Sequence, residues 1–392
     1  MISLRRNSFW LLFARISTLG LAVLFVALVA RRLGTASFGQ FTFIATIVLI
    51  GNVFTSFGTD TLLIREISKA GRVTSLAARA FTLQVVLSGI WCFATFIFWA
   101  DSLLLIYSLS LFPLTLFSIA SALLRAFERM DLFWGLSIIN GFIQIICAIL
   151  SQDLPTLCIS LLMGNIVSAF LALWICSASL PRFSLFPFLD FRPLIRVALP
   201  FAALATLGIL SQRLGILSVS LLAGDAATGL FSAAARVVDG MKLGHYAVLG
   251  ALLPALSRNA LDSKQGYRTA FLGLLSISVL IAGVTMFFAG PILYFLFGEK
   301  YTPAVSLLIV LVWTLVPYTI SAFISVDLVV RGLEYTLVKA TVISLLMYVV
   351  LYIWLINFRG LSGAVWAALI GECLQAVVLA LFYSLNHQVV VE

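Results

Sequence analysis

Residues 231–250, FSAAARVVDGMKLGHYAVLG, contain several ionisable residues in a chain that is otherwise strongly apolar. They place Arg236, Asp239, Lys242 and His245 within a stretch that is long enough to cross a membrane as a helix. Of the 392 residues, 62% are hydrophobic and only 10% are charged. A soluble domain is about half apolar and roughly one quarter charged. The composition therefore predicts an integral membrane protein, in which residues 231–250 are the segment that most needs explaining.

The apolar runs are long enough to span the bilayer as helices, and they lack the alternation of outer-membrane β-strands. We therefore expect an all-α polytopic membrane protein with 12 transmembrane helices in two six-helix lobes, residues 1–182 and 183–392. The expected helices cover residues 9–30, 39–61, 76–100, 103–124, 133–150, 155–178, 194–222, 227–256, 269–292, 303–327, 337–357 and 361–384.

The distribution of basic residues tests this scheme, because Lys and Arg in short loops are retained on the cytoplasmic side. With twelve helices and a cytoplasmic N-terminus, sixteen of the 24 basic residues are cytoplasmic and four lie on the opposite side. The other four, Arg15, Arg213, Arg236 and Lys242, lie within helices. If residues 227–256 did not cross, the basic loops on either side of helix 194–222 would face opposite sides of the membrane. The pattern predicts that 227–256 crosses and that both termini are cytoplasmic.

The two halves of the chain also repeat one another. The segments LGTASFGQF (33–41) and AGDAATGLF (223–231) match at an offset of 190 residues. The matched positions are Gly34 with Gly224, Gly39 with Gly229, and Phe41 with Phe231. An even number of helices in each lobe predicts parallel repeats, which in transporters bind their substrate between the lobes near the bilayer midplane. The repeat therefore points to transport.

Five short motifs follow in order along the chain: RRLGTASFGQF (31–41), LLIREISK (62–69), RAFER (125–129), LFGEKYTPA (296–304) and RGLE (331–334). Together they resemble the polysaccharide flippases of the MOP superfamily, and most closely the Wzx-like O-antigen or capsule repeat-unit translocases. The resemblance implies a MATE-like V-shaped bundle in the bacterial cytoplasmic (inner) membrane. It also implies a non-enzymatic flippase that moves undecaprenyl-pyrophosphate-linked oligosaccharide from the inner to the outer leaflet by alternating access.

The same resemblance implies the partners: a lipid-linked oligosaccharide as cargo, membrane lipids, and a polysaccharide polymerase and ligase as candidate neighbours. We expect a monomer that binds no nucleic acid. A cation-coupled multidrug or small-molecule exporter of the same superfamily is the alternative, because one fold serves several substrates. A membrane enzyme acting on polyprenyl phosphate is a third hypothesis, but the loops offer only isolated acids.

The ionisable residues at membrane depth are the candidate site, because each costs roughly 2.5 to 3.5 kcal/mol to insert and tends to mark a pathway or a pair. Arg15, Arg213, Arg236 and Lys242 against Asp239 predict a cavity of net charge about +3, which favours an anion such as pyrophosphate. The candidate sugar contacts are His245, Gln84, Gln144 and Gln212. Three alternatives stay open: Arg15 reaches the membrane interface, Arg236 and Asp239 pair within their helix, and His245 is an interfacial hydrogen-bonder.

Energy coupling is less visible in the sequence. A Gly-rich phosphate loop is absent, which argues against direct use of ATP. We expect no cofactor and no metal site, with coupling to a proton or sodium gradient as the open option. The intramembrane acids that would bind such an ion are Asp60, Asp239 and Glu372. Glu372 is equally compatible with a packing role.

Overall fold

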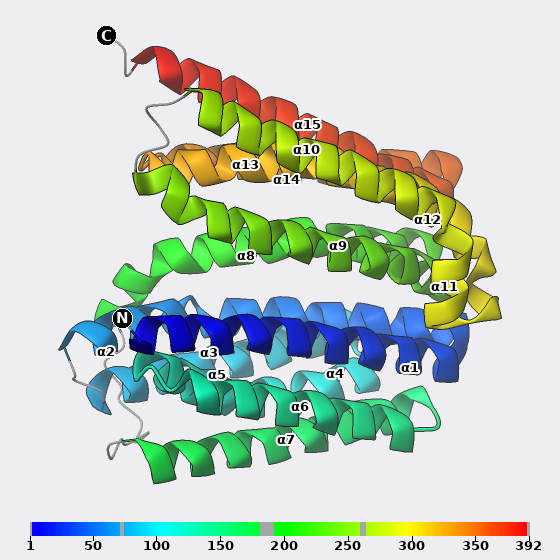
Figure 1. Cartoon of the computed structure of the whole chain (residues 1–392). Coiled ribbons are helices and arrows are strands. Elements are labelled where there is room, and N and C mark those ends of the chain that lie inside the picture. Colours follow the sequence, from blue (N-terminus) through cyan, green and yellow to red (C-terminus); the bar gives the residue numbers. More distant parts are fainter. Residues whose placement is uncertain (1, 71–73, 181–191, 259–263, 390–392) are drawn as a thin grey trace. The chain divides into compact units, whose positions relative to one another are not determined.

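A computed structural model gives the fold of the chain (Figure 1). It describes the backbone of residues 2–70, 74–180, 192–258 and 264–389. Within these segments, side chains are described except at residues 2–12, 14–16, 68–70, 74–75, 192–193, 200, 243–258, 264–267, 334 and 386–389. Nearly all of the described backbone is helical, as the apolar runs predict.

The first half of the chain forms seven helices. They are α1 (Ile2–Ser56), α2 (Thr59–Ala70), α3 (Thr74–Trp99), α4 (Ser102–Ser108), α5 (Leu111–Ala126), α6 (Met130–Leu150) and α7 (Leu154–Ser179). Two expected spans, 9–30 and 39–61, are merged in α1, which is interrupted at Gly34. The expected span 103–124 is divided into α4 and α5, just before Pro113.

The second half begins with four long or medium helices: α8 (Arg192–Ala223), α9 (Asp225–Arg258), α10 (Lys264–Phe287) and α11 (Ala289–Phe297). A broken span follows, made of η2 (Glu299–Ala304), α12 (Val305–Leu311), η3 (Val312–Thr314) and α13 (Leu315–Val330). The chain ends with α14 (Glu334–Arg359) and α15 (Leu361–Val389). Most elements overlap a predicted span, but α2, η2 and the second half of α11 lie mainly in segments that the sequence analysis assigns to connections.

Among the described residues, ten stretches are long and apolar enough to cross a membrane, so the chain is a multi-pass membrane protein. The number falls below twelve for two physical reasons. Residues 17–67 count as one stretch although Gly34 interrupts them. The described part of α9 is too charged to qualify, because it carries Asp225, Arg236, Asp239 and Lys242. At 34 residues, or about 51 Å, α9 is nevertheless long enough to span, and the count of twelve stays a prediction.

The chain divides into two compact units, but not at the expected boundary near residue 182. Unit 1 contains residues 1–33 and 43–209, and unit 2 contains residues 34–42 and 210–392. The first part of α8 belongs to unit 1 because Leu194 and Ala198 are buried in the core formed by α2, α3 and α5. In addition, Gly58 lies against Phe201. Side-chain packing, rather than the linker at 180–193, therefore sets this boundary.

Four glycines that the sequence repeat aligns have matching roles. Gly34 and Gly224 both have a left-handed backbone, with φ of 77° and 84°, where the helices change direction. Gly39 and Gly229 lie in unit 2, where α1 and α9 touch through their backbones. A Cβ atom on Gly39 would lie 1.8 Å from the Asp225 carbonyl oxygen, and one on Gly229 would lie 2.0 Å from that of Thr35. Only glycine allows this contact, which holds residues 34–42 against the start of α9.

The close backbone contact at Gly39 predicts that alanine substitutions at different glycines will change the stability of the protein by very different amounts. We expect Gly39→Ala to destabilise the protein by about 3 kcal/mol or more, because the methyl group meets backbone atoms that cannot rotate away. Gly273→Ala is the control, since a Cβ atom there has nothing within 4 Å and alanine favours helices. Thermal unfolding of both purified variants in detergent checks this expectation. Equal melting temperatures would contradict it.

Candidate functional site

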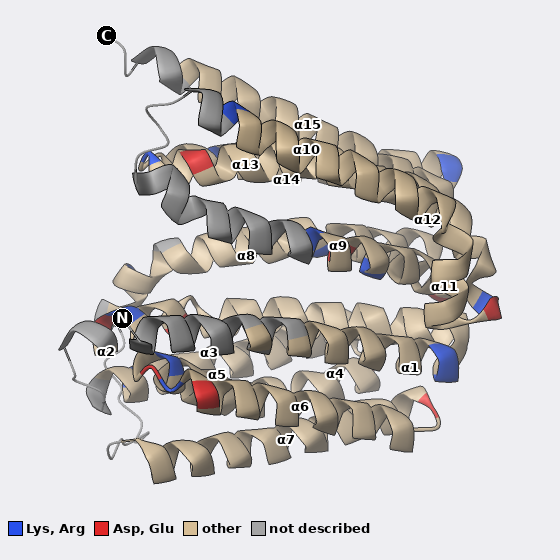
Figure 2. Cartoon of the chain, viewed as in Figure 1, with Lys and Arg blue, Asp and Glu red and all other residues tan. Residues whose placement is uncertain are grey.

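Besides Asp225 in its first turn, α9 carries Arg236, Asp239 and Lys242 part-way along its length, where Figure 2 shows basic residues on this helix. Ala233, Ala234 and Val238 pack one side of α9 into unit 2 and are almost completely buried. Arg236, Asp239 and Lys242 are partly buried. Successive steps of three residues turn the helix by about −60°, so these three side chains leave α9 in different directions. They consequently meet different neighbouring helices.

Asp239 pairs with the adjacent helix α8. The Arg213 guanidinium donates through Nη1 to Asp239 Oδ2 at 3.2 Å. The Arg213 side chain is 12% exposed and that of Asp239 is 40% exposed. The intrahelical pair between Arg236 and Asp239 is not among the ion pairs within 4 Å in the described part of the chain. The partner of Asp239 is therefore Arg213 of α8, whereas the alternative in the sequence analysis pairs Asp239 with Arg236 of its own helix.

Lys242 pairs with the last helix of the chain. Its ammonium Nζ donates to Glu372 Oε1 of α15 at 2.6 Å. The same nitrogen lies 4.6 Å from the centre of the Tyr318 ring on α13, which is a favourable cation–π distance. The side chains of Lys242 and Glu372 are 21% and 13% exposed. The pair thus joins α9, α13 and α15 at a site largely removed from solvent.

Arg236 differs from both neighbours. Among the described residues, no carboxylate lies within ion-pair distance of its guanidinium, and its buried Nε has no hydrogen-bond partner. The buried Nε of Arg213 also lacks a partner in the described residues, although its Nη1 is engaged. Unsatisfied charged donors in a buried position are costly. An anion that brings several acceptor oxygens would satisfy both guanidinium groups.

The described part of this cluster contains one more acid than the sequence analysis counted. Glu372 joins the cluster through Lys242, and Arg15 falls outside the described side chains. Three cations, Arg213, Arg236 and Lys242, then face two carboxylates, Asp239 and Glu372. Among these five described residues one positive charge is left in excess, that of Arg236, while the expected net charge of about +3, which includes Arg15, stays a prediction.

Two tyrosines of α14 complete the cluster, and the sequence reasoning missed them. Tyr348 and Tyr352 stack with ring centres 6.3 Å apart and both lie beside Glu372. They fit because glycines face them. A Cβ atom on Gly371 would lie 2.2 Å from the Tyr348 ring, and one on Gly215 would lie 2.7 Å from the Tyr352 hydroxyl. Two tyrosines four residues apart in an apolar span are the signal that could have revealed them, since such a pair shares one helix face.

Unit 1 contains a separate polar network around Asp60 of α2. Both carboxylate oxygens accept from the Ser118 hydroxyl of α5, at 2.7 and 2.8 Å. Nearby, the Gln84 amide of α3 donates to the Thr59 hydroxyl at 2.7 Å. Gln84 is only 1% exposed. Its amide is therefore part of the packing between α2 and α3, which gives it an alternative to the predicted sugar contact.

The other predicted residues are scattered. Gln144 of α6 is half-buried and Gln212 of α8 is exposed. Arg15 and His245 lie outside the described side chains. The structure thus gathers Arg213, Arg236, Asp239, Lys242 and Glu372 in unit 2, while Asp60 and Gln84 lie in unit 1.

Similarity to solved structures defines the class of protein. The chain matches a multidrug resistance MATE family transporter of the MOP superfamily, inward-facing, with a TM-score of 0.71 and 18% identity over 94% of each chain. It matches the lipid II flippase MurJ, inward closed, with a TM-score of 0.73 and 16% identity over 95% of this chain and 86% of that one. It also matches a MOP superfamily transporter from Pyrococcus furiosus Vc1 (DSM3638), which is described by a reverse polarity of its binding pocket. The TM-score is 0.62 and the identity 16%, over 98% of this chain and 97% of that one. The fold is that of MOP-superfamily membrane transporters and flippases.

The family follows from the sequence match. The model of the polysaccharide biosynthesis proteins covers residues 4–260, more than half of the chain. The chain therefore belongs to the polysaccharide biosynthesis protein family, and the predicted resemblance to MOP-superfamily polysaccharide flippases is confirmed. No curated protein matches the chain.

The Arg213–Asp239 pair predicts a non-additive effect of substitution. We expect Asp239→Leu alone to destabilise the protein by about 1 to 3 kcal/mol, because it leaves Arg213 without its acceptor. The double variant Arg213→Met/Asp239→Leu should be less destabilised than that single variant. A double-mutant cycle of thermal or SDS-induced unfolding measures the coupling. Additive effects would show that the two groups do not interact.

Proposed function

We propose that this protein is a flippase that carries undecaprenyl-pyrophosphate-linked oligosaccharide from the inner to the outer leaflet of the cytoplasmic membrane by alternating access. Its family of polysaccharide biosynthesis proteins supports a lipid-linked sugar as cargo. Its fold, shared with the lipid II flippase MurJ, supports movement of a lipid with a large polar headgroup. The proposal extends to O-antigen or capsule repeat units as cargo.

The observation that carries this proposal is the uncompensated charge of Arg236. Asp239, its nearest acid on α9, is already engaged by Arg213, so it cannot fully neutralise Arg236. The planar guanidinium fork suits phosphate oxygens, with which it forms paired charge-assisted hydrogen bonds. A diphosphate would supply the acceptors that Arg236 and the Nε of Arg213 lack. A cationic drug would be repelled at the same place, which favours a flippase over a multidrug exporter.

We further propose that a proton or sodium gradient drives the cycle through Asp60, without a cofactor. Of the three candidate acids, Asp239 and Glu372 already pair with cations. Asp60 instead accepts from the Ser118 hydroxyl and has Gln84 and Arg125 nearby, but its carboxylate forms no ion pair within 4 Å in the described part of the chain. A carboxylate without a paired cation is the kind that takes up a coupling ion within a membrane.

Substitution of Arg236 tests the cargo site. In a strain lacking this gene, we expect plasmid-borne Arg236→Ala to fail to restore surface polysaccharide, although the variant protein remains in the membrane. Arg236→Glu should be worse, because it places a carboxylate against the phosphates. Arg268→Ala is the matched control, since Arg268 is exposed near the start of α10 and should restore the polysaccharide. Lipid extracts of the strain with Arg236→Ala should accumulate lipid-linked oligosaccharide.

Three outcomes contradict the proposal. Full complementation by Arg236→Ala would show that Arg236 is not needed to bind the cargo. Equal phenotypes for the alanine and glutamate variants would favour a packing role of Arg236. Drug sensitivity of the deletion strain, with normal surface polysaccharide, would favour the multidrug exporter.

A further inference from the structure

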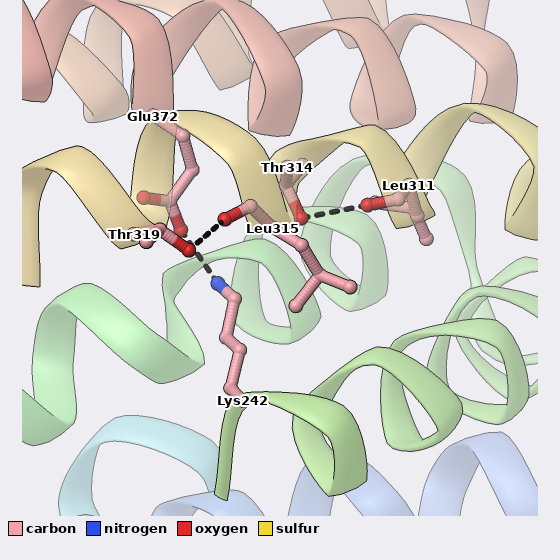
Figure 3. A network of polar contacts seen from close by, with 6 residues as sticks. All are labelled: Lys242, Leu311, Thr314, Leu315, Thr319 and Glu372. Carbon is pink, nitrogen blue, oxygen red and sulfur yellow. Dashed lines mark hydrogen bonds and ion pairs between the residues drawn. The ribbon is translucent and has the colours of Figure 1, made fainter. Parts of the chain in front are cut away.

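The Lys242–Glu372 pair is the closest contact between charged side chains in the described part of the chain, at 2.6 Å. Figure 3 shows Lys242 extending from α9 toward Glu372, with Thr319 of α13 beside the carboxylate. The Thr319 hydroxyl is bonded to the Leu315 carbonyl at 2.7 Å. Lys242, a cation at membrane depth, is thus paired with a carboxylate of its own chain.

Every element that packs on this part of α15 is accounted for. From α9 comes Lys242, from α13 the Tyr318 ring, and from α14 the pair Tyr348 and Tyr352. Cys373 follows Glu372 on α15 itself. The two remaining neighbours, α12 and η3, contain no titratable side chain. Lys242 is therefore the cationic partner that faces Glu372 among the described residues.

The position of Lys242 on α9 relates it to the proposed cargo site. Six residues separate it from Arg236, which is about 9 Å along the helix axis. Its flexible four-carbon stem lets the ammonium group swing over several ångströms, and its side chain is 21% exposed. The two side chains leave α9 in directions about 120° apart, so Lys242 meets a diphosphate bound at Arg236 only when its ammonium group leaves Glu372 and turns along α9 toward Arg236.

We propose that Glu372 is an internal counter-anion, which binds Lys242 while the carrier is empty and is displaced when a prenyl diphosphate binds. This inference rests on the proposed function. A diphosphate carries more negative charge and more acceptor oxygens than one carboxylate, so it can replace Glu372 on the ammonium group. The displaced carboxylate then takes one proton from water, because an unpaired carboxylate in a buried site is costly. Lys242 stays protonated throughout, and charge balances on both sides of the exchange.

Two consequences separate this role from simple packing. Glu372 competes with the ligand, so its removal should tighten binding of the diphosphate, whereas loss of a purely structural contact would weaken it. The empty carrier of such a variant would also hold the Lys242 ammonium at membrane depth without the Glu372 carboxylate, which is costly. The return of the empty carrier to its cargo-loading state should therefore slow. Tighter binding and slower return together should give a lower KM and a lower kcat.

The experiment is isothermal titration of the full-length protein in nanodiscs with geranyl diphosphate, in two buffers of different ionisation enthalpy. For Glu372→Gln we expect the Kd to fall by about tenfold, the scale of one charge-assisted hydrogen bond. We also expect about one proton fewer to be taken up per ligand than in the natural protein. Protonation of the diphosphate itself is the same in both proteins and therefore cancels.

A double-mutant cycle tests whether the effect passes through Lys242. We expect Lys242→Met to weaken binding and Glu372→Gln to have no further effect in the Lys242→Met background. If Glu372→Gln does not purify as a folded protein, Glu372→Asp is used instead. Its shorter side chain loosens the pair, so it should give an intermediate gain in affinity.

The outcomes distinguish this inference from the proposed function. If neither the natural protein nor any variant binds geranyl diphosphate, the proposed function itself fails. If the natural protein binds it, and Glu372→Gln or Glu372→Asp binds with unchanged affinity and proton uptake, only the counter-anion is overturned. Weaker binding by the glutamine variant also overturns it and assigns Glu372 a packing role.

Discussion

The need to neutralise charge inside hydrocarbon governs the arrangement of unit 2. Each ionised group at membrane depth costs a few kcal/mol, and the cost falls when an oppositely charged side chain accompanies it. The chain meets this constraint with partners from different helices. Asp239 joins α9 to α8 through Arg213, and Lys242 joins α9 to α15 through Glu372. These contacts also fix the rotation of α9 about its own axis, because the side chains leave the helix in different directions.

One charge escapes this neutralisation, and it gives the fold a specific chemistry. MOP-superfamily transporters and flippases share one architecture, so the architecture does not select the cargo. In the function proposed above, the difference lies in side chains such as Arg236, whose guanidinium has no ion pair among the described residues while Arg213 and Lys242 are paired. A buried donor of this kind is unfavourable in an empty protein and becomes favourable when an anion arrives. The site is thus better explained by its occupied state than by its empty one.

The sequence predicts some of these features well and others poorly, for physical reasons. Long apolar runs specify helices, so the all-α fold and the approximate bounds of most long helices follow from composition, whereas α2 and η2 lie mainly outside the predicted spans. The glycine repeat also predicts paired special positions, and Gly39 and Gly229 meet in the structure. The ion pairs could not be predicted, because helical periodicity identifies neighbours within a helix but not across helices. For this reason Arg236 is a natural partner for Asp239 in sequence, while Arg213, 26 residues away, is the partner in space. The unit boundary was missed likewise, since the core contacts of Leu194 and Ala198 depend on tertiary packing.

The backbone contact between residues 34–42 and α9 has a consequence for biogenesis. These residues leave the ribosome early, but the glycine that they touch, Gly229, follows about 190 residues later. Throughout that interval residues 34–42 lack the rest of unit 2, to which they belong. The second half of the chain, made alone, would lack this segment. The two halves that the sequence repeat defines are thus not independent folding units, because residues 34–42 of the first half pack with the second.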